Sequence, residues 1–108
     1  MKARTIPPGA EAEAASALLK TLASPHRLMI ACRLARGEET VGALAAFLGA
    51  RESAVSQHLA VMRRERVVSA RREGQLVRYA LRSQAARDII KVLSKSICGF
   101  EAAQSLRS

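Results

Sequence analysis

The sequence has 108 residues, of which 49% are hydrophobic and only three are aromatic, so it can form one domain with a modest core. Its formal net charge of +9 favours polyanionic partners such as nucleic acids, although charge alone gives no sequence preference. No apolar run suits a membrane span and the first residues lack the hydrophobic stretch of a signal peptide, so we expect a cytoplasmic protein with no membrane partner.

The N-terminal third of the chain predicts an arm and two helices. Residues 1–10, which contain two consecutive prolines, are predicted to form a flexible arm. An alanine-rich segment over 11–23 has high helix propensity, and its apolar face is wider than one small core requires. Ser24 as N-cap and Pro25 at the first helical position start a second helix over 26–36. That helix is apolar nearly all round, which predicts burial.

The centre of the chain predicts two short helices joined through a glycine. Thr40 can cap a helix over 41–48, and Gly49 then closes a tight turn into the next helix. In that next helix apolar and polar residues occupy opposite faces. The apolar face carries Val55, Leu59 and Met62, and the other carries Ser53, Ser56, Gln57 and Ala60. One face is expected to pack and the other to remain exposed, which is the arrangement of a helix-turn-helix.

The C-terminal third predicts a hairpin and a last helix. Two extended runs over 67–72 and 75–81 flank Glu73-Gly74, which favours a turn. The last helix is predicted over 83–99 and, like the first, has more apolar surface than one small domain needs. We therefore expect the first and last helices to pair in a homodimer, which places two reading helices in successive major grooves about 34–36 Å apart.

Together these elements predict a mainly α fold with a small β-hairpin wing, a winged helix-turn-helix domain over 11–100 that is followed by a tail over 101–108. Between Arg51 and Arg82 eight arginines stand against three glutamates, so +5 of the net charge of +9 lies on the proposed reading element. Amide and hydroxyl groups on the helix can read base edges, while guanidinium groups hold phosphates. The sequence therefore predicts double-stranded DNA as the partner.

The order of elements and three short motifs resemble the ArsR/SmtB family of winged helix-turn-helix repressors. The motifs are Pro25-x-Arg27, Val55-Ser56-Gln57-His58-Leu59 and Arg71-Arg72-Glu73-Gly74 before Tyr79. The resemblance covers about residues 18–99 and implies a dimeric repressor that leaves a palindromic operator when an inducer binds or reacts. It implies base contacts by Ser53, Ser56, Gln57 and His58 and wing contacts by Arg71, Arg72 and Arg78. Arg51 stands where many members place a serine cap, and we expect it to reach a phosphate.

The metal ligands of the family's metal sensors are absent from this sequence. Those members carry a Cys-x-Cys pair before the turn, or Asp and His ligands along the last helix. The first position here reads Thr40-Val41-Gly42, and the last helix has Asp88 with no histidine after it. The remaining soft ligands are Cys32, Cys98, His26 and His58, which lack a short metal-binding spacing. The sequence therefore predicts neither a metal site nor a cofactor.

The two cysteines are placed like those of the family's dithiol branch, which responds to persulfides and oxidants. The resemblance implies that Cys32 and Cys98 become joined by a disulfide or polysulfide bridge and that the operator is then released. Cys98 is expected to attack first because nearby Lys95 favours its thiolate, and Cys32 to act as the resolving thiol. Without the resemblance, both cysteines are interpreted as reduced apolar fillers.

Two alternative functions stay open on the sequence. A repressor of this fold could carry inert cysteines and sense another ligand or a metal, or a winged-helix module could bind nucleic acid or protein without sequence preference. Steep salt dependence with no loss on scrambling the site would identify a general binder. An enzyme is not expected, because the chain has no acidic dyad, no nucleophile paired with a histidine and no phosphate-cradling glycine loop.

Overall fold

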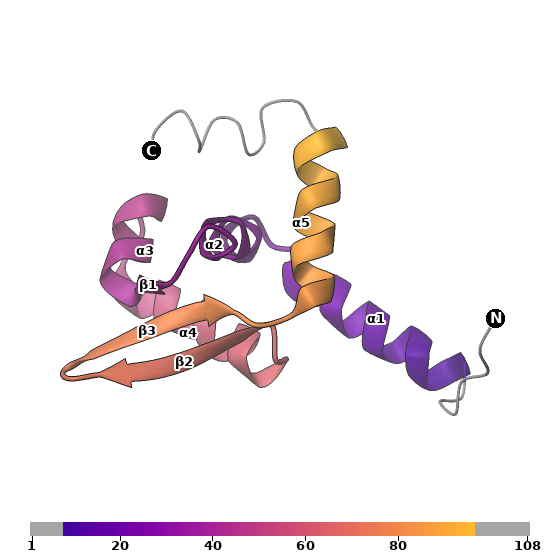
Figure 1. Cartoon of the computed structure of the whole chain (residues 1–108), viewed down its shortest axis with the longest axis horizontal. Coiled ribbons are helices and arrows are strands. Elements are labelled where there is room, and N and C mark those ends of the chain that lie inside the picture. The colour runs from indigo at the N-terminus through magenta and orange to yellow at the C-terminus, as the bar shows by residue number, and fades with distance from the viewer. Residues whose placement is uncertain (1–7, 97–108) are drawn as a thin grey trace.

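The structure, a computed structural model, describes residues 8–96 as five helices and three strands. In chain order the elements are α1 (Pro8–Leu22), α2 (Pro25–Leu34), β1 (Glu39–Thr40), α3 (Val41–Leu48), α4 (Glu52–Arg64), β2 (Val68–Glu73), β3 (Leu76–Leu81) and α5 (Gln84–Ser96). Figure 1 shows α1 and α5 at the end of the molecule opposite the tip of the β2–β3 hairpin. Most of the predicted N-terminal arm and all of the predicted C-terminal tail lie outside the described residues.

Hydroxyl side chains cap three of the helices, and two of these caps were predicted. The Ser24 hydroxyl accepts a hydrogen bond from the backbone N–H of Arg27 at 3.4 Å, and the Thr40 hydroxyl accepts one from Ala43 at 3.2 Å. Ser83 caps α5 in the same way. These local bonds satisfy N–H groups that have no partner inside a helix, so they fix where α2, α3 and α5 begin.

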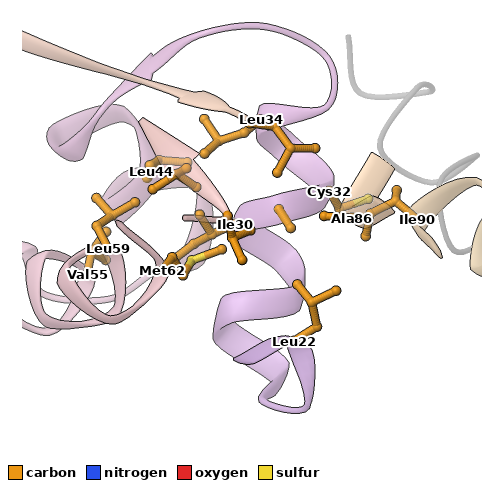
Figure 2. Close-up of a cluster of buried hydrophobic side chains, with 14 of the residues drawn as sticks. Leu22, Ile30, Cys32, Leu34, Leu44, Val55, Leu59, Met62, Ala86 and Ile90 are labelled. Carbon is orange, nitrogen blue, oxygen red and sulfur yellow. The ribbon is translucent and has the colours of Figure 1, made fainter. Parts of the chain in front are cut away.

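Helix α2 forms the centre of the core, as its apolar sequence predicted. Ile30 and Cys32 have no exposed surface, and α2 contacts α3, α4, β3 and α5. Figure 2 shows Ile30 beside Met62 of α4, and Cys32 on the side of α2 that faces Ala86 of α5. The helix ends at Leu34, earlier than predicted, because the N–H groups of Arg36 and Gly37 form tighter backbone bonds to the carbonyl three residues back.

Helices α3 and α4 form the predicted helix-turn-helix. Gly49 ends α3 with a φ of 66°, a left-handed conformation that favours glycine, and the N–H of Ala50 bonds back to the carbonyl of Ala45. The chain then enters α4 after one further residue, Arg51. This short connection leaves α3 and α4 in contact and fixes the direction in which α4 crosses the domain.

The hairpin strands lie within one residue of their predicted bounds, but the sheet has a third strand that the sequence did not predict. The order is β1-β3-β2 and both pairings are antiparallel. Strand β1 has only two residues, with Glu39 opposite Tyr79 and Thr40 opposite Arg78. Two residues are too few to show the alternation by which strands are predicted. The pairing attaches the hairpin to the start of α3, and the whole is the predicted winged helix-turn-helix fold.

Helices α1 and α5 carry apolar side chains that their own domain leaves exposed, as predicted. Leu19 of α1 is 55% exposed and Val92 of α5 is 60% exposed. On the same helices Leu22 and Ile90 are buried in the core, so each helix has one packed side and one side with surplus apolar surface. Among residues 8–96, no helix combines the length and the apolar character needed to cross a membrane.

Candidate nucleic-acid interface

Helix α4 has one buried face and one exposed polar face. Val55, Leu59 and Met62 have at most 1% of their surface exposed and anchor the helix on the core. Ser53, Ser56, Gln57 and Ala60 are all exposed on the other face. Within the described part of the chain, the Ser53, Ser56 and Gln57 side chains form no hydrogen bond, so their donors and acceptors are available to a partner. We call these three side chains the reading face.

The N-terminus of α4 lacks a side-chain cap. Arg51 occupies the cap position in an extended conformation, is exposed, and makes no capping hydrogen bond. The first N–H groups of α4 are therefore left to water or to another acceptor, and the positive end of the helix dipole adds to the guanidinium charge. The predicted phosphate contact of Arg51 fits this geometry and stays a prediction.

His58 is turned toward the start of α2. Its ring lies edge to face with that of His26, with 5.5 Å between the ring centroids, and its Nδ1 lies 3.5 Å from Nη1 of Arg27. Burial lowers the pKa of His58, and electrostatic repulsion by Arg27 and by His26 lowers it further. The lowered pKa favours the neutral ring, which can accept a hydrogen bond from Arg27 at Nδ1. Its predicted base contact remains a prediction.

Arg27 joins three helices at this point. Its Nε donates to the carbonyl of Thr21 at 2.6 Å and its Nη2 lies 3.5 Å from the carbonyl of Lys20, near the end of α1. A cation at a helix C-terminus satisfies carbonyls that have no partner inside the helix. Because Nη1 of the same guanidinium faces His58, the end of α1 and the middle of α4 share one side chain.

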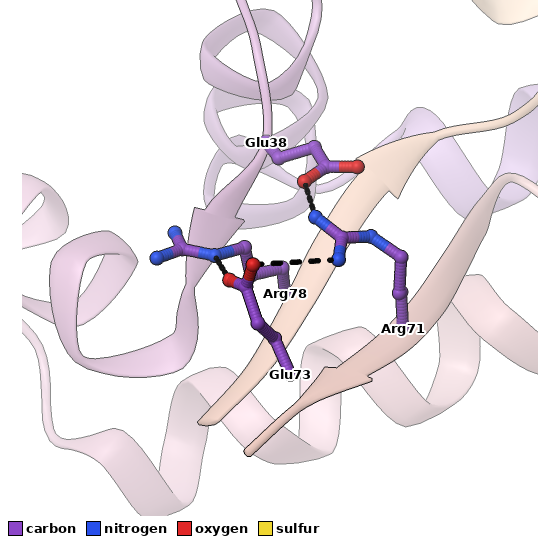
Figure 3. Close-up of polar contacts among 4 residues, drawn as sticks. All are labelled: Glu38, Arg71, Glu73 and Arg78. Atoms are coloured by element: carbon purple, nitrogen blue, oxygen red, sulfur yellow. Dashed lines mark hydrogen bonds and ion pairs between the residues drawn. The ribbon is translucent and has the colours of Figure 1, made fainter. Parts of the chain in front are cut away.

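The hairpin carries two of the predicted arginines in ion pairs (Figure 3). Nη2 of Arg71 donates to Oε1 of Glu38 at 2.6 Å, and its Nη1 lies 3.8 Å from Oε2 of Glu73. Nε of Arg78 donates to the other oxygen of Glu73. The hydrogen bond from Arg78 is the main cause that lowers the pKa of Glu73, and the bond to Glu38 is the main cause that raises the pKa of Arg71. Both shifts favour the charged forms of Glu73 and Arg71.

Arg72, the third predicted wing residue, lies on the other side of the hairpin. Side chains alternate along a strand, so Arg72 shares its side with Val68, whereas Arg71 and Glu73 share the opposite side. Arg72 is exposed and has no ion pair among the residues that the structure describes. The sequence predicted the arginines but not Glu38, which is 33 residues from Arg71 and precedes a strand that no sequence pattern predicted.

The structure describes only one of the two predicted redox residues. Cys32 is fully buried on the side of α2 that faces α5, whereas Cys98 lies outside the described residues, two positions beyond Ser96. Residues 8–96 contain no group of three or more His, Cys, Asp or Glu side chains that could hold a metal ion. The fold thus places the Cys32 sulfur at the contact between α2 and α5, toward the helix that leads to Cys98.

Comparison with known proteins gives the same picture of the fold. Residues 24–70 match the family described as bacterial regulatory protein, arsR family. The chain is 45% identical over 84 residues to the biofilm growth-associated repressor of Agrobacterium fabrum, a match that covers 78% of this chain and 72% of that protein.

Two solved structures are similar over most of the chain. The transcriptional repressor BigR from Xylella fastidiosa has a TM-score of 0.79 and 34% identity, covering 84% of this chain and 93% of that one. A homodimeric winged helix-turn-helix DNA-binding domain from Mycobacterium bovis, described as a possible ArsR-family regulator, has a TM-score of 0.76 and 25% identity. That match covers 98% of this chain and 94% of that one.

Proposed function

We propose that the chain, which belongs to the arsR family of bacterial regulatory proteins, is a homodimeric repressor whose reading face binds a palindromic operator. We propose further that the operator is released when Cys32 and Cys98 become cross-linked by a persulfide or another oxidant. Because the partner is chromosomal DNA, the proposed place of action is the bacterial cytoplasm. In this proposal the two thiols of the protein react with the oxidant, and the protein does not act as an enzyme on a separate substrate.

The observation that carries the DNA-binding proposal is the contrast between the two faces of α4. Three buried side chains hold the helix rigidly, and the polar groups of the reading face have no partner within the described residues. Amide and hydroxyl groups on a fixed helix are suited to base edges in the major groove. The remaining predicted contacts are proposed with them: Arg51, Arg71, Arg72 and Arg78 to phosphates, and His58 to a base.

The dimer proposal rests on the surplus apolar surface of α1 and α5. Large apolar side chains such as Leu19 and Val92 are more than half exposed on helices whose other sides are buried. A second copy of the same chain would remove this surface from water through an isologous interface. The Mycobacterium bovis structure of the same fold is a homodimer, which supports this assignment. The domain is proposed to extend over 11–100, with a tail after it, although α1 itself begins three residues before this range, at Pro8.

The proposed switch begins at Cys98, which follows α5 in the chain. The Cys98 thiolate attacks the outer sulfur of a persulfide, forms a Cys98 persulfide and releases a thiolate. The Cys32 thiol then attacks the inner sulfur of this persulfide, which gives a disulfide and releases hydrogen sulfide. When both cysteines are persulfidated, the same attack gives a trisulfide. A direct disulfide requires the two Cα atoms to lie about 4.4–6.8 Å apart, and added sulfur relaxes that limit.

A cross-link between Cys32 and Cys98 would act on DNA binding through the dimer. Cys32 faces α5, so a bond from Cys32 to Cys98 would change how α5 sits on its own domain. Because α5 is proposed to contact the partner subunit, the spacing of the two reading helices would change with it. Moving the dimer from almost fully bound to almost fully released requires a difference of about 5.5 kcal/mol between its two states.

The test is a titration of one DNA duplex, selected in vitro from a random pool by the reduced protein. We expect tight binding by the reduced protein, binding at least about 100-fold weaker after persulfide treatment, and no weakening of a treated Cys98→Ser variant. Mass spectrometry should find Cys32 and Cys98 joined in the treated native protein. Equal affinity in all three samples would remove the switch and leave the DNA-binding proposal intact. Equal affinity for a scrambled duplex would identify a general nucleic-acid binder instead.

A further inference from the structure

The outer face of the hairpin, which is the side of β2 and β3 opposite buried Val68, carries Arg71, Glu73 and Arg78. Glu38, in the loop before β1, extends this row, so that acidic and basic side chains alternate in the order Glu38, Arg71, Glu73 and Arg78. Arg71 and Arg78 are paired residues on neighbouring strands, an arrangement in which like charges repel. Glu73 lies two residues after Arg71 and bonds to both arginines, and Glu38 reaches Arg71 from the loop before β1. The four groups together carry no net charge.

These ion pairs are accessible to another anion. The exposed fraction of the four side chains ranges from 35% to 53%, so water reaches every partner. Exposed ion pairs are weak because solvent screens them, and a DNA phosphate is an equivalent acceptor for a guanidinium group. The two carboxylates therefore pair with the same guanidinium groups that the hairpin would offer to the DNA backbone. Arg72 on the other face has no such partner within the described chain.

Resting on the DNA-binding function proposed above, we propose that Glu38 and Glu73 stand in for DNA phosphates on Arg71 and Arg78, so that these two arginines contact the DNA backbone only on the operator. On a non-cognate duplex, where the reading face is not seated in the groove, phosphates meet the hairpin only loosely and do not displace the carboxylates. The ion pairs then stay closed and the two arginines add nothing to binding. On the operator, the docked α4 brings the backbone to the hairpin, and phosphates take the place of both glutamates.

This exchange makes a prediction about salt dependence. Each cation that neutralises a phosphate releases a counterion and contributes about −0.9 to the slope of log K against log salt concentration. In the native protein, Arg71 and Arg78 contribute to the slope on the operator but not on a non-cognate duplex. Removal of the carboxylate charges should let them contribute on both, so the non-cognate slope should steepen by up to about 1.8 per subunit.

The experiment uses the full-length variants Glu38→Gln, Glu73→Gln and their combination. Asp88→Asn is the matched control, because it removes the same charge on α5, where Asp88 accepts a hydrogen bond from Gln84 that asparagine can also accept. The probes are a duplex selected in vitro by the native protein and a scrambled duplex of the same composition. Dissociation constants for both are measured between about 50 and 200 mM salt, the range over which counterion release is resolved.

We expect the double variant to bind the scrambled duplex roughly three- to tenfold more tightly, with the steeper slope, because its freed arginines add contacts there. Binding to the selected duplex should also tighten, because phosphates no longer have to displace the carboxylates, but its slope should stay the same. The Asp88→Asn control should change neither duplex, because a distant exposed charge is screened. An unchanged slope on the scrambled duplex, or no tightening on either duplex, would overturn this inference alone. A native protein that enriches no duplex from the pool would overturn the proposed function, and this inference with it.

Discussion

The reading face of α4 and the outer face of the hairpin are both proposed to contact DNA, yet their side chains differ in whether they already have partners within the protein. The polar groups of the reading face have no partner within the described residues, whereas Arg71 and Arg78 are closed in ion pairs. Neutral amides and hydroxyls attract no distant anion, so they can remain open without raising affinity for every duplex. Guanidinium groups attract any polyanion, and a neighbouring carboxylate limits that attraction.

The largest effect should come from loosening the helix that carries the reading face. Leu59→Ala removes a side chain that is 1% exposed, and we expect it to lower the free energy of unfolding by about 2–5 kcal/mol. Ser56→Ala on the exposed face should change it by less than about 0.5 kcal/mol. Urea unfolding measures both. Similar losses from the two substitutions would contradict the division of α4 into an anchored face and an exposed face.

The next largest effect is expected on DNA affinity, from a residue of the reading face that does not contribute to folding. Gln57→Ala should weaken binding to a selected duplex by about 1–3 kcal/mol, because an amide that reads a base edge is lost. Stability and binding to a scrambled duplex should hardly change, since Gln57 is exposed and its side chain makes no hydrogen bond within the described residues. Gln75→Ala, at the exposed hairpin turn, is the matched control and should leave selectivity intact. If Gln75→Ala reduced selectivity as much, the assignment to α4 would be wrong.

A smaller effect is expected from the unpaired arginine of the hairpin. Arg72→Ala should weaken binding to the selected and scrambled duplexes alike and reduce both salt slopes by about 0.9 per subunit, because no carboxylate within the described residues pairs with Arg72. Lys91→Ala on α5 removes the same charge from an exposed position away from the hairpin and should leave both slopes unchanged. A loss confined to the selected duplex would mean that Arg72 reads bases rather than phosphate.

The smallest effect concerns His58, which lies between the reading face and the core. Its lowered pKa means that the unfolded chain takes up a proton more readily than the folded protein. His58 should therefore cost no stability above a pH of about 6.5 and lower stability progressively as the pH falls through that value. His58→Asn keeps an acceptor for Arg27 but does not titrate, so its urea midpoint should fall less between pH 8 and pH 5.5. An identical fall would contradict this account.

Most of the fold could be predicted because its signals are local. The caps by Ser24 and Thr40, the glycine at position 49 and the apolar spacing of α4 each involve residues within one or two turns of each other. The periodicity of α4 also identified which side chains would be exposed, since a helix has only one way to bury Val55, Leu59 and Met62 together.

The features that the sequence did not reveal are contacts between distant segments. Glu38 meets Arg71 across 33 positions, and Arg27 meets His58 across 31. Strand β1 exists only because β3 pairs with it. A charge pattern shows that arginines are present but not which carboxylates face them, so the closed state of the hairpin required the structure. The roles assigned to the reading face, the arginines and the cysteines remain predictions.

The proposed role of α4 is tested most directly by selecting a duplex with the reduced native protein and then measuring methylation interference on the selected sequence. We predict an inverted repeat whose half-sites lie about one helical turn apart, because two copies of α4 enter successive major grooves. Methylation of base edges in the major groove of either half-site should block binding. Enrichment of no sequence, or binding that major-groove methylation leaves unchanged, would contradict the claim that α4 reads DNA.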